Sequence, residues 1–183
     1  SQASLSAALF YLLSTTWTVA GLFLLADLVA SQRGSARDTV VTAPPMHNRT
    51  LLSVLFLVGA VAAVGLPPLS GFFGKVLILK SVTPGPEMAW LWGVLLVGSF
   101  FSLIAYARAG SIVFWRTVSG HIEDTRPLKA RTATATGALL ALSIVIVALA
   151  GPIAQYTDAT AAQLKDRDAY LNILQTPVVG EDD

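Results

Sequence analysis

The chain has 183 residues, of which 54% are apolar and only 13% are charged, and its mean hydropathy is +0.66. Soluble domains usually carry about a quarter charged residues, so this composition excludes an ordinary soluble enzyme. The formal net charge is +1 and the sequence has no strongly basic run, which argues against a nucleic-acid partner. No cysteine is present, which excludes disulfides, thiolate catalysis and cysteine-based metal centres.

The charges are kept apart from long apolar stretches. Four such stretches together hold 116 residues and only three charges, Asp27, Lys75 and Arg108. One membrane crossing needs about 20 mostly apolar residues. The sequence therefore predicts an all-α, polytopic membrane bundle of four transmembrane helices, which occupies residues 1–157. We expect these helices at about 4–30, 50–80, 88–115 and 132–157.

The first predicted helix carries hydroxyl side chains in its interior, among them Ser14 and Thr15. Such hydroxyls bond to carbonyls one turn back or to a neighbouring helix, so they serve helix packing. The alternative is a proton or water path lined by hydroxyls, with Ser14 and Thr15 as members. Asp27 is expected at the membrane interface, where it is solvated.

The second predicted helix contains the most informative motif, Gly65-Leu-Pro-Pro, followed by Gly71. Two prolines remove two amide donors and disfavour the helical conformation before them, and glycine permits positive φ. We expect two half-helices joined by an unwound stretch at about 65–71, built on Gly65, Pro67, Pro68 and Gly71. Irregular backbone at membrane depth is tolerated where it is buried in protein or lines a wet cavity, and it often binds ions in transporters.

Lys75 follows directly after the predicted break. A lysine deep in a membrane costs about 2.5–3.5 kcal/mol unless it reaches the interface, pairs or loses its proton. Lys80 is available as the interfacial lysine, so Lys75 is the leading candidate for a proton-transfer group. The alternative is that Lys75 extends to the interface.

Arg108 lies in the last third of the third predicted helix. Its long side chain is expected to reach the following loop, and the alternative is a permanently charged electrostatic partner for a neighbouring titratable group. The fourth predicted helix has no charge and is expected to be structural, with a kink or an end at Gly151-Pro152.

The two loops at 31–50 and 116–131 hold seven basic residues, against three on the opposite face. By the positive-inside rule these loops are cytoplasmic and both termini lie outside. The tail, 158–183, has apolar residues at helical spacing before a polar end, which predicts a short amphipathic helix followed by a disordered tail. The chain starts abruptly, so we expect it to be the later part of a longer protein.

The stretch Gly65-Leu-Pro-Pro-Leu-Ser-Gly-Phe-Phe-Gly-Lys75 resembles the signature of the antiporter-like membrane subunits that Mrp-type Na⁺/H⁺ antiporters share with respiratory complex I. Phe23-Leu-Leu-Ala-Asp-Leu and the ending Thr160-Ala-Ala-Gln-Leu agree, and the tail is most similar to the D-type subunits of the Mrp antiporters. The resemblance covers nearly the whole chain.

The resemblance implies that this chain corresponds to the last four of about fourteen helices, with Lys75 as the lysine of the second half-channel. It also implies bacterial inner-membrane location and partner subunits in a multisubunit complex. Two departures matter. The glutamate–lysine pair of the first half-channel belongs to helices that this chain does not contain. A histidine common on the first of these helices is matched by Ser14, so Ser14, Thr15 and water would have to replace it.

The sequence thus predicts part of a proton-translocating subunit of a Na⁺/H⁺ antiporter, acting on protons and monovalent cations in the lipid bilayer. It is not expected to be an enzyme, and neither a cofactor nor a metal site is expected. One alternative is an antiporter-like subunit of respiratory complex I. Another is a structural subunit in which Lys75 only pairs with an acid.

Overall fold

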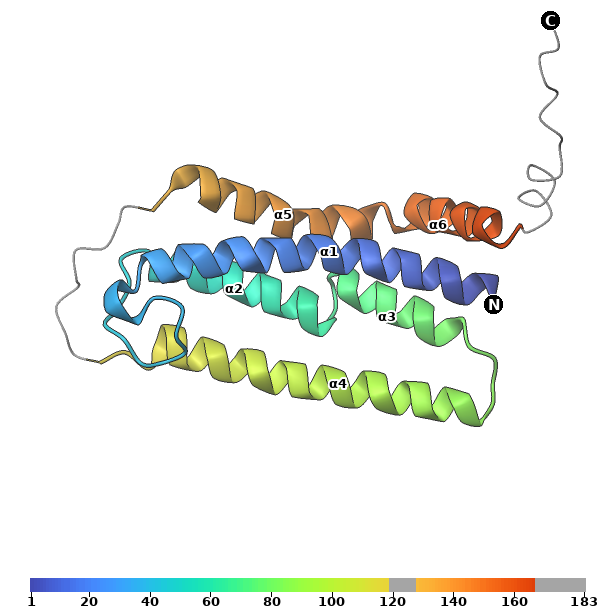
Figure 1. Ribbon diagram of the computed structural model, residues 1–183, viewed down its shortest axis with the longest axis horizontal. Helices are drawn as coiled ribbons and strands as arrows, with labels where there is room; N and C mark the ends of the chain where they lie inside the picture. Colours follow the sequence, from blue (N-terminus) through green and yellow to red (C-terminus); the bar gives the residue numbers. More distant parts are fainter. Residues whose placement is uncertain (119–127, 167–183) are drawn as a thin grey trace, which may run out of the picture.

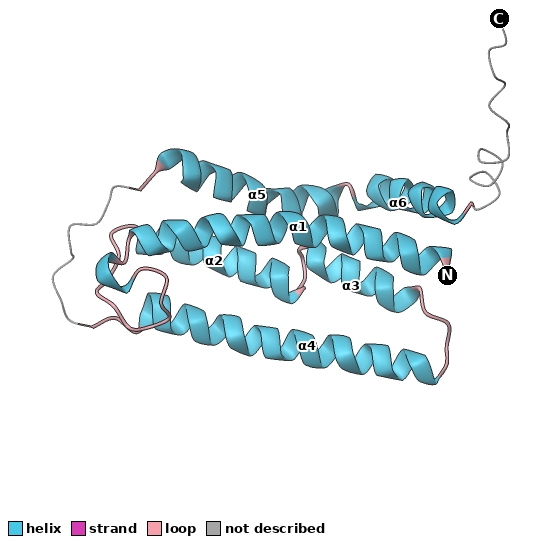
Figure 2. Ribbon diagram, in the orientation of Figure 1, coloured by secondary structure: helices cyan, strands magenta, loops and turns pink. Residues whose placement is uncertain are grey.

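The computed structural model describes residues 1–118 and 128–166, and this part of the chain is helical without any β-strand, apart from one isolated bridge between Ala43 and Thr117 (Figure 2). The all-α prediction is confirmed. The α-helices are α1 Gln2–Ser31, α2 Arg49–Val64, α3 Ser70–Lys80, α4 Pro86–Gly110, α5 Ala130–Ala148 and α6 Ala150–Lys165. A short 3₁₀ helix, η1 Gly34–Ala36, follows α1, and a π-helical turn, η2 Ser111–Trp115, extends α4.

The helices lie side by side, with α1 at the centre (Figure 1). α1 packs against α5 and α6 on one side and against α2 and α3 on the other. α4 packs on α2 and α3, away from α5. At 1.5 Å per residue the 30 residues of α1 span about 45 Å, more than the roughly 30 Å hydrocarbon core of a bilayer.

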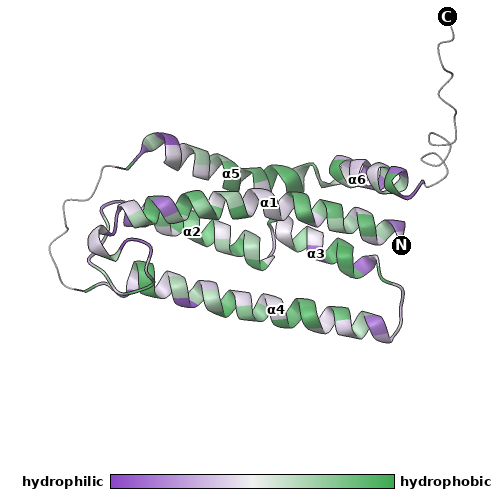
Figure 3. Ribbon diagram, viewed as in Figure 1, coloured by the Kyte–Doolittle hydropathy of each residue, from purple (hydrophilic) through white to green (hydrophobic). Residues whose placement is uncertain are grey.

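Within the residues that the structure describes, three helical stretches are long and apolar enough to cross a membrane: Gln2–Ser31, Pro86–Trp115 and Ala130–Ala148. The second of the four expected crossings is divided between α2, which is apolar but shorter, and α3, which continues in line with it along α1 (Figure 1). Hydrophobic residues, drawn in green, predominate along these helices, and the most hydrophilic residues, drawn in purple, lie mainly towards the helix ends and loops (Figure 3). This pattern is typical of helices that meet hydrocarbon along their length and water at their ends.

The fourth expected helix is interrupted, as expected from Gly151-Pro152, but two residues before that pair. Instead of one helix over 132–157, the chain forms α5 and α6, which are separated at Leu149. Pro152 accounts for the interruption, because it has no amide hydrogen for the carbonyl four residues earlier and is tolerated only in the first turn of a new helix. The boundary expected between 157 and 158 also falls inside α6, and the tail from 167 onward lies outside the described residues.

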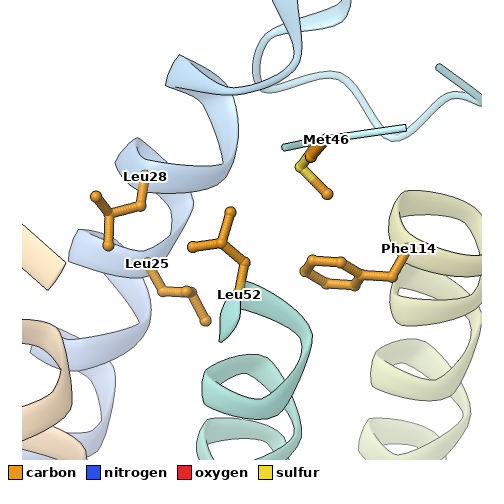
Figure 4. Close-up of a cluster of buried hydrophobic side chains, with 5 residues drawn as sticks. All are labelled: Leu25, Leu28, Met46, Leu52 and Phe114. Atoms are coloured by element: carbon orange, nitrogen blue, oxygen red, sulfur yellow. The ribbon is translucent and has the colours of Figure 1, made fainter. Parts of the chain in front are cut away.

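A cluster of buried apolar side chains closes one end of the bundle. Leu25 and Leu28 of α1, Leu52 of α2 and Phe114 of η2 meet Met46 from the loop before α2 (Figure 4). The loop is fixed by Arg33, which is buried and donates hydrogen bonds to the carbonyls of Arg37, Thr39 and Val41. Burial lowers the pKa of the Arg33 guanidinium from its ordinary value.

Candidate functional site

The break between α2 and α3 is formed by residues 65–69. Gly65 has φ 76° and ψ 46°, the left-handed conformation that glycine adopts without steric cost. The Leu66 amide donates to the Val61 carbonyl at 3.0 Å and the Gly65 amide donates to the Ala62 carbonyl at 3.2 Å, which is the hydrogen-bond pattern of a Schellman motif. Pro67 and Pro68 then prevent the helix from continuing.

Gly71 does not lie in the unwound stretch where the sequence placed it. It belongs to the first turn of α3, which begins at Ser70. A Cβ atom at Gly71 would lie 2.2 Å from the carbonyl oxygen of Ala62. The absence of a side chain therefore lets the start of α3 press directly against the last turn of α2. The correction arises because the residues up to Leu69 are enough to interrupt the helix after Gly65, and helical backbone resumes at Ser70.

Lys75 is half-buried and connects three helices through its ammonium group. Its Nζ donates to the carbonyl of Val64 at 2.6 Å and to the hydroxyl of Ser99 on α4 at 2.6 Å. The side chain crosses Gly65, where a Cβ atom would come within 2.9–3.0 Å of three Lys75 side-chain atoms. The lysine is therefore folded back over the break that precedes it in the sequence.

The carbonyl of Val64 gives this arrangement an electrostatic reason. Val64 is the last residue of α2, where carbonyl groups have no partner within the helix and the helix dipole places partial negative charge. An ammonium group at this position satisfies a carbonyl and complements the dipole. The break thus supplies Lys75 with its acceptor. A continuous helix, which the prolines prevent, would not leave this carbonyl available to Lys75.

Ser99 is a partner that the sequence analysis did not identify. It lies in the middle of α4, its hydroxyl donates to the Leu95 carbonyl at 2.6 Å, and its oxygen accepts from Lys75. Serine in an apolar membrane helix was the available signal, because a polar group at that depth needs a partner. The same helix also carries Ser102, and the sequence does not determine which of the two faces α3.

Ser70, at the start of α3, adds an unusual group to the same region. Its side chain is fully buried, and its hydroxyl oxygen has no hydrogen-bond partner among the described residues. Leaving a buried hydroxyl without a partner costs free energy, and ordered water commonly satisfies such groups. An apolar cavity of about 360 Å³ also lies between α2 and α4, and Val64 and Leu66 line it beside the break.

Ser14 and Thr15 use their hydroxyls within α1. Ser14 is buried and donates to the Tyr11 carbonyl at 2.9 Å, and Thr15 donates to the same carbonyl at 2.8 Å. The hydrogen bonds of Lys75 run to α2 and α4 instead. The structure does not join Ser14 and Thr15 to Lys75 by a hydrogen bond, although Tyr11 contacts α3 at Gly74.

Arg108 is exposed, and it lines a surface pocket with Ser111, Ile112 and Arg116. It lies nine residues beyond Ser99 on α4, which corresponds to about 13 Å along the helix axis. The alternative role as an electrostatic partner of Lys75 therefore receives no support from its position. Among the described residues, no group of three histidine or acidic side chains could hold a metal ion.

Comparison with known proteins agrees with this architecture. Residues 1–105 match the transmembrane family described as NADH:quinone oxidoreductase/Mrp antiporter. The D subunit of a probable K⁺/H⁺ antiporter of Rhizobium meliloti is 29% identical over 87% of this chain and 34% of its own length. The D subunit of a Na⁺/H⁺ antiporter of Alkalihalophilus pseudofirmus is 26% identical over 93% of this chain and 34% of its own length.

A third relative belongs to a redox complex: the N subunit of the NADH-quinone oxidoreductase of Salinibacter ruber is 27% identical over 81% of this chain and 31% of its own length. The chain spans about a third of the length of these curated relatives. The matched residues include the break, Lys75 and Ser99. With its helical membrane fold and its lysine-bearing broken helix, the chain belongs to the family of membrane subunits shared by NADH:quinone oxidoreductases and Mrp antiporters.

Proposed function

We propose that this chain is part of a proton-translocating subunit of a multisubunit monovalent cation/proton antiporter, and that Lys75 takes up and releases the proton. The observation that carries the proposal is the position of the Lys75 ammonium between the Val64 carbonyl and the Ser99 hydroxyl, at the point where α2 is broken. The antiporter subunits among the relatives support exchange of protons against Na⁺ or K⁺.

The chemistry of the site suits reversible protonation. Among the described residues, Lys75 bonds to a carbonyl and to a hydroxyl, and neither carries a formal charge that would fix the ammonium permanently. The partial charge of the α2 terminus stabilises the protonated form only moderately. Lysine responds strongly to such surroundings, whereas arginine remains charged in proteins.

Water has to reach Lys75 if protons move through the site. The unwound residues 65–69 and the unpartnered hydroxyl of Ser70 support hydration beside the lysine, because irregular backbone in a membrane is tolerated where it lines a wet cavity. Partner subunits or further helices of the same protein complete the path, because the described helices leave most of α4 uncovered.

Replacing Lys75 tests the proposal. In membrane vesicles that contain the complete antiporter complex, we expect Lys75→Ala to reduce cation-dependent proton exchange to the background level. Lys80→Ala is the matched control, because Lys80 is exposed at the end of the same helix and should be dispensable. Normal exchange by Lys75→Ala in a normally assembled complex would reject the proposal and favour a structural subunit.

A second candidate is an antiporter-like subunit of a complex I type enzyme, which the NADH-quinone oxidoreductase relatives favour. The two candidates differ in the proteins with which the chain assembles. Purification of the intact complex should recover further antiporter subunits under the first proposal, and redox subunits with quinone reductase activity under the second.

We also propose that the protein lies in the bacterial inner membrane with loops 31–50 and 116–131 on the cytoplasmic side. Seven basic residues on this face against three on the other support the orientation. Single cysteines at exposed Asp38 and Thr83 should be labelled from opposite sides by a membrane-impermeant maleimide. Labelling of Asp38→Cys from the outside of intact cells would reverse the proposed orientation.

A further inference from the structure

We propose that Ser99 is a positioning residue for Lys75 that bonds to it in both protonation states by rotating its hydroxyl. This inference rests on the proposed function and adds a second side chain to its site. Three hydrogen bonds carry it: Lys75 to Val64, Lys75 to Ser99, and Ser99 to Leu95, each 2.6 Å long.

The charged state of Lys75 requires acceptors only. An ammonium group has three N–H donors and no lone pair. The Val64 carbonyl accepts one of them, and the Ser99 oxygen accepts another. Ser99 can act as an acceptor because its own hydrogen is bound to the Leu95 carbonyl. The hydroxyl hydrogen therefore points away from Lys75 when the lysine is protonated.

The neutral state of Lys75 requires a donor. Once a water molecule has taken one proton, the amine retains two N–H groups and gains a lone pair. The Val64 carbonyl still accepts an N–H, but it has no hydrogen to offer. Ser99 has one, and rotation about its Cβ–Oγ bond can turn this hydrogen from Leu95 to the lysine nitrogen. No covalent bond of Ser99 breaks, so the transferred proton passes between Lys75 and water alone.

The rotation leaves no buried group without a partner. The Leu95 carbonyl lies inside α4, where it accepts the backbone amide four residues later in addition to the Ser99 hydroxyl. When the hydroxyl turns away, this helical hydrogen bond remains. Ser99 can thus satisfy both forms of Lys75 without rearrangement of the backbone.

The same helix offers a matched comparison. Ser102 donates to the Gly98 carbonyl at 2.8 Å, as Ser99 does to Leu95, but no hydrogen bond joins it to α3 within the described residues. Removal of either hydroxyl has the same effect on α4 itself. Only removal of the Ser99 hydroxyl deprives Lys75 of a partner.

The direction of the pH effect follows from hydrogen-bond strength. Hydrogen bonds to a charged donor are roughly twice as strong as neutral ones, so Ser99 favours protonated Lys75 over the neutral form. Without the Ser99 hydroxyl, Lys75 should lose its proton at a lower pH. The other titratable or charged residues around Lys75 remain in place when Ser99 is replaced. On the elements that pack against α3, these residues are Tyr11, Asp27, Arg49, Glu87, Tyr106, Arg108 and Arg131.

The experiment compares Ser99→Ala, Ser99→Thr, Ser102→Ala and Lys75→Ala in the complete complex, with exchange measured across a range of pH. We expect Ser99→Ala to exchange about tenfold more slowly and its pH midpoint to move by about one unit towards acid. Ser99→Thr retains a hydroxyl, so its exchange rate and its pH midpoint should equal those of the wild type. Ser102→Ala should match the wild type. Complex assembly is measured for every variant by co-purification.

Three results would overturn the role of Ser99: wild-type rate and midpoint in Ser99→Ala, a lower rate with an unchanged midpoint, or an equal shift in Ser102→Ala. If Lys75→Ala is inactive in the same series, the proposed function survives any of these results. If Lys75→Ala exchanges normally, the proposed function itself fails.

Discussion

Between α1 and its neighbours α5 and α6, buried hydroxyls bond to each other, whereas between α3 and α4 a hydroxyl bonds to a lysine. Thr18 pairs with Ser143 at 3.3 Å and Ser6 pairs with Thr157 at 3.0 Å. These groups are neutral, and they hold helices together in a way common in membrane proteins. Polar residues in the membrane part of this chain therefore meet two kinds of partner, another hydroxyl on one side of α1 and a lysine on the other.

The difference between the two regions lies in backbone geometry as well as in side chains. α1 is a continuous helix, and its hydroxyls bond to backbone carbonyls of the same helix or to a hydroxyl of a neighbouring helix. The crossing formed by α2 and α3 is broken, and the carbonyl of Val64 at the end of α2 is free to accept a hydrogen bond from the Lys75 ammonium. The lysine thus lies where the end of a helix supplies a backbone acceptor.

The largest structural effect is expected for Gly71→Ala. The new methyl group would lie 2.2 Å from the Ala62 carbonyl oxygen, so α3 has to move away from α2. Such overpacking costs up to about 3 kcal/mol. We expect a lower thermal unfolding temperature for the purified complex, together with loss of exchange. Gly98→Ala is the control, because its new methyl group would meet open space and its stability should not fall.

Gly65→Ala should have the next largest effect. Alanine in the left-handed conformation costs about 1–2 kcal/mol, and its methyl group displaces the Lys75 side chain. We expect exchange to fall by about 10- to 100-fold, because the lysine is misplaced. Gly85→Ala provides the comparison, since Gly85 has an extended φ of 174° and open space around it. Wild-type exchange by Gly65→Ala would show that Lys75 does not depend on the break.

A small effect on stability alone is expected on the other side of α1. A double-mutant cycle of Thr18→Ala and Ser143→Ala should give a coupling of about 0.6 kcal/mol in unfolding free energy. Exchange by both single variants should equal that of the wild type. A large loss of exchange would instead support the path of hydroxyls along α1 that the sequence left open.

The smallest effect is expected for Arg108→Gln. Arg108 is exposed and lies about 13 Å along α4 from Ser99, so it does not contact the site of Lys75. Exchange and its pH profile should remain unchanged. A shifted pH profile would restore Arg108 as an electrostatic partner.

Much of the fold could be predicted because it depends on local composition. Long apolar stretches indicated the helices, and Gly65 with Pro67 and Pro68 predicted the interruption of the second one. Gly151-Pro152 likewise predicted an interruption of the fourth helix, but the structure places it at Leu149, because Pro152 is accommodated in the first turn of α6.

The partners of Lys75 could not be predicted, because they depend on the rotation of each helix about its axis. Ser99 and Ser102 are equally polar in the sequence, and only the packing of α4 on α3 selects Ser99. The same holds for Ser14, whose hydroxyl was a candidate for the proton path but bonds within α1. Sequence indicates which polar groups lie in the membrane, and packing determines which of them meet.

The most direct test of the central proposal is exchange by a Lys75→Arg complex. Arginine retains the positive charge and the hydrogen-bond donors that hold α2, α3 and α4 together, but it does not release its proton. If Lys75 cycles between protonated and neutral forms, the variant complex should assemble normally and show no cation/proton exchange. Wild-type exchange by the assembled variant would contradict the proposal, because a fixed charge would then be sufficient.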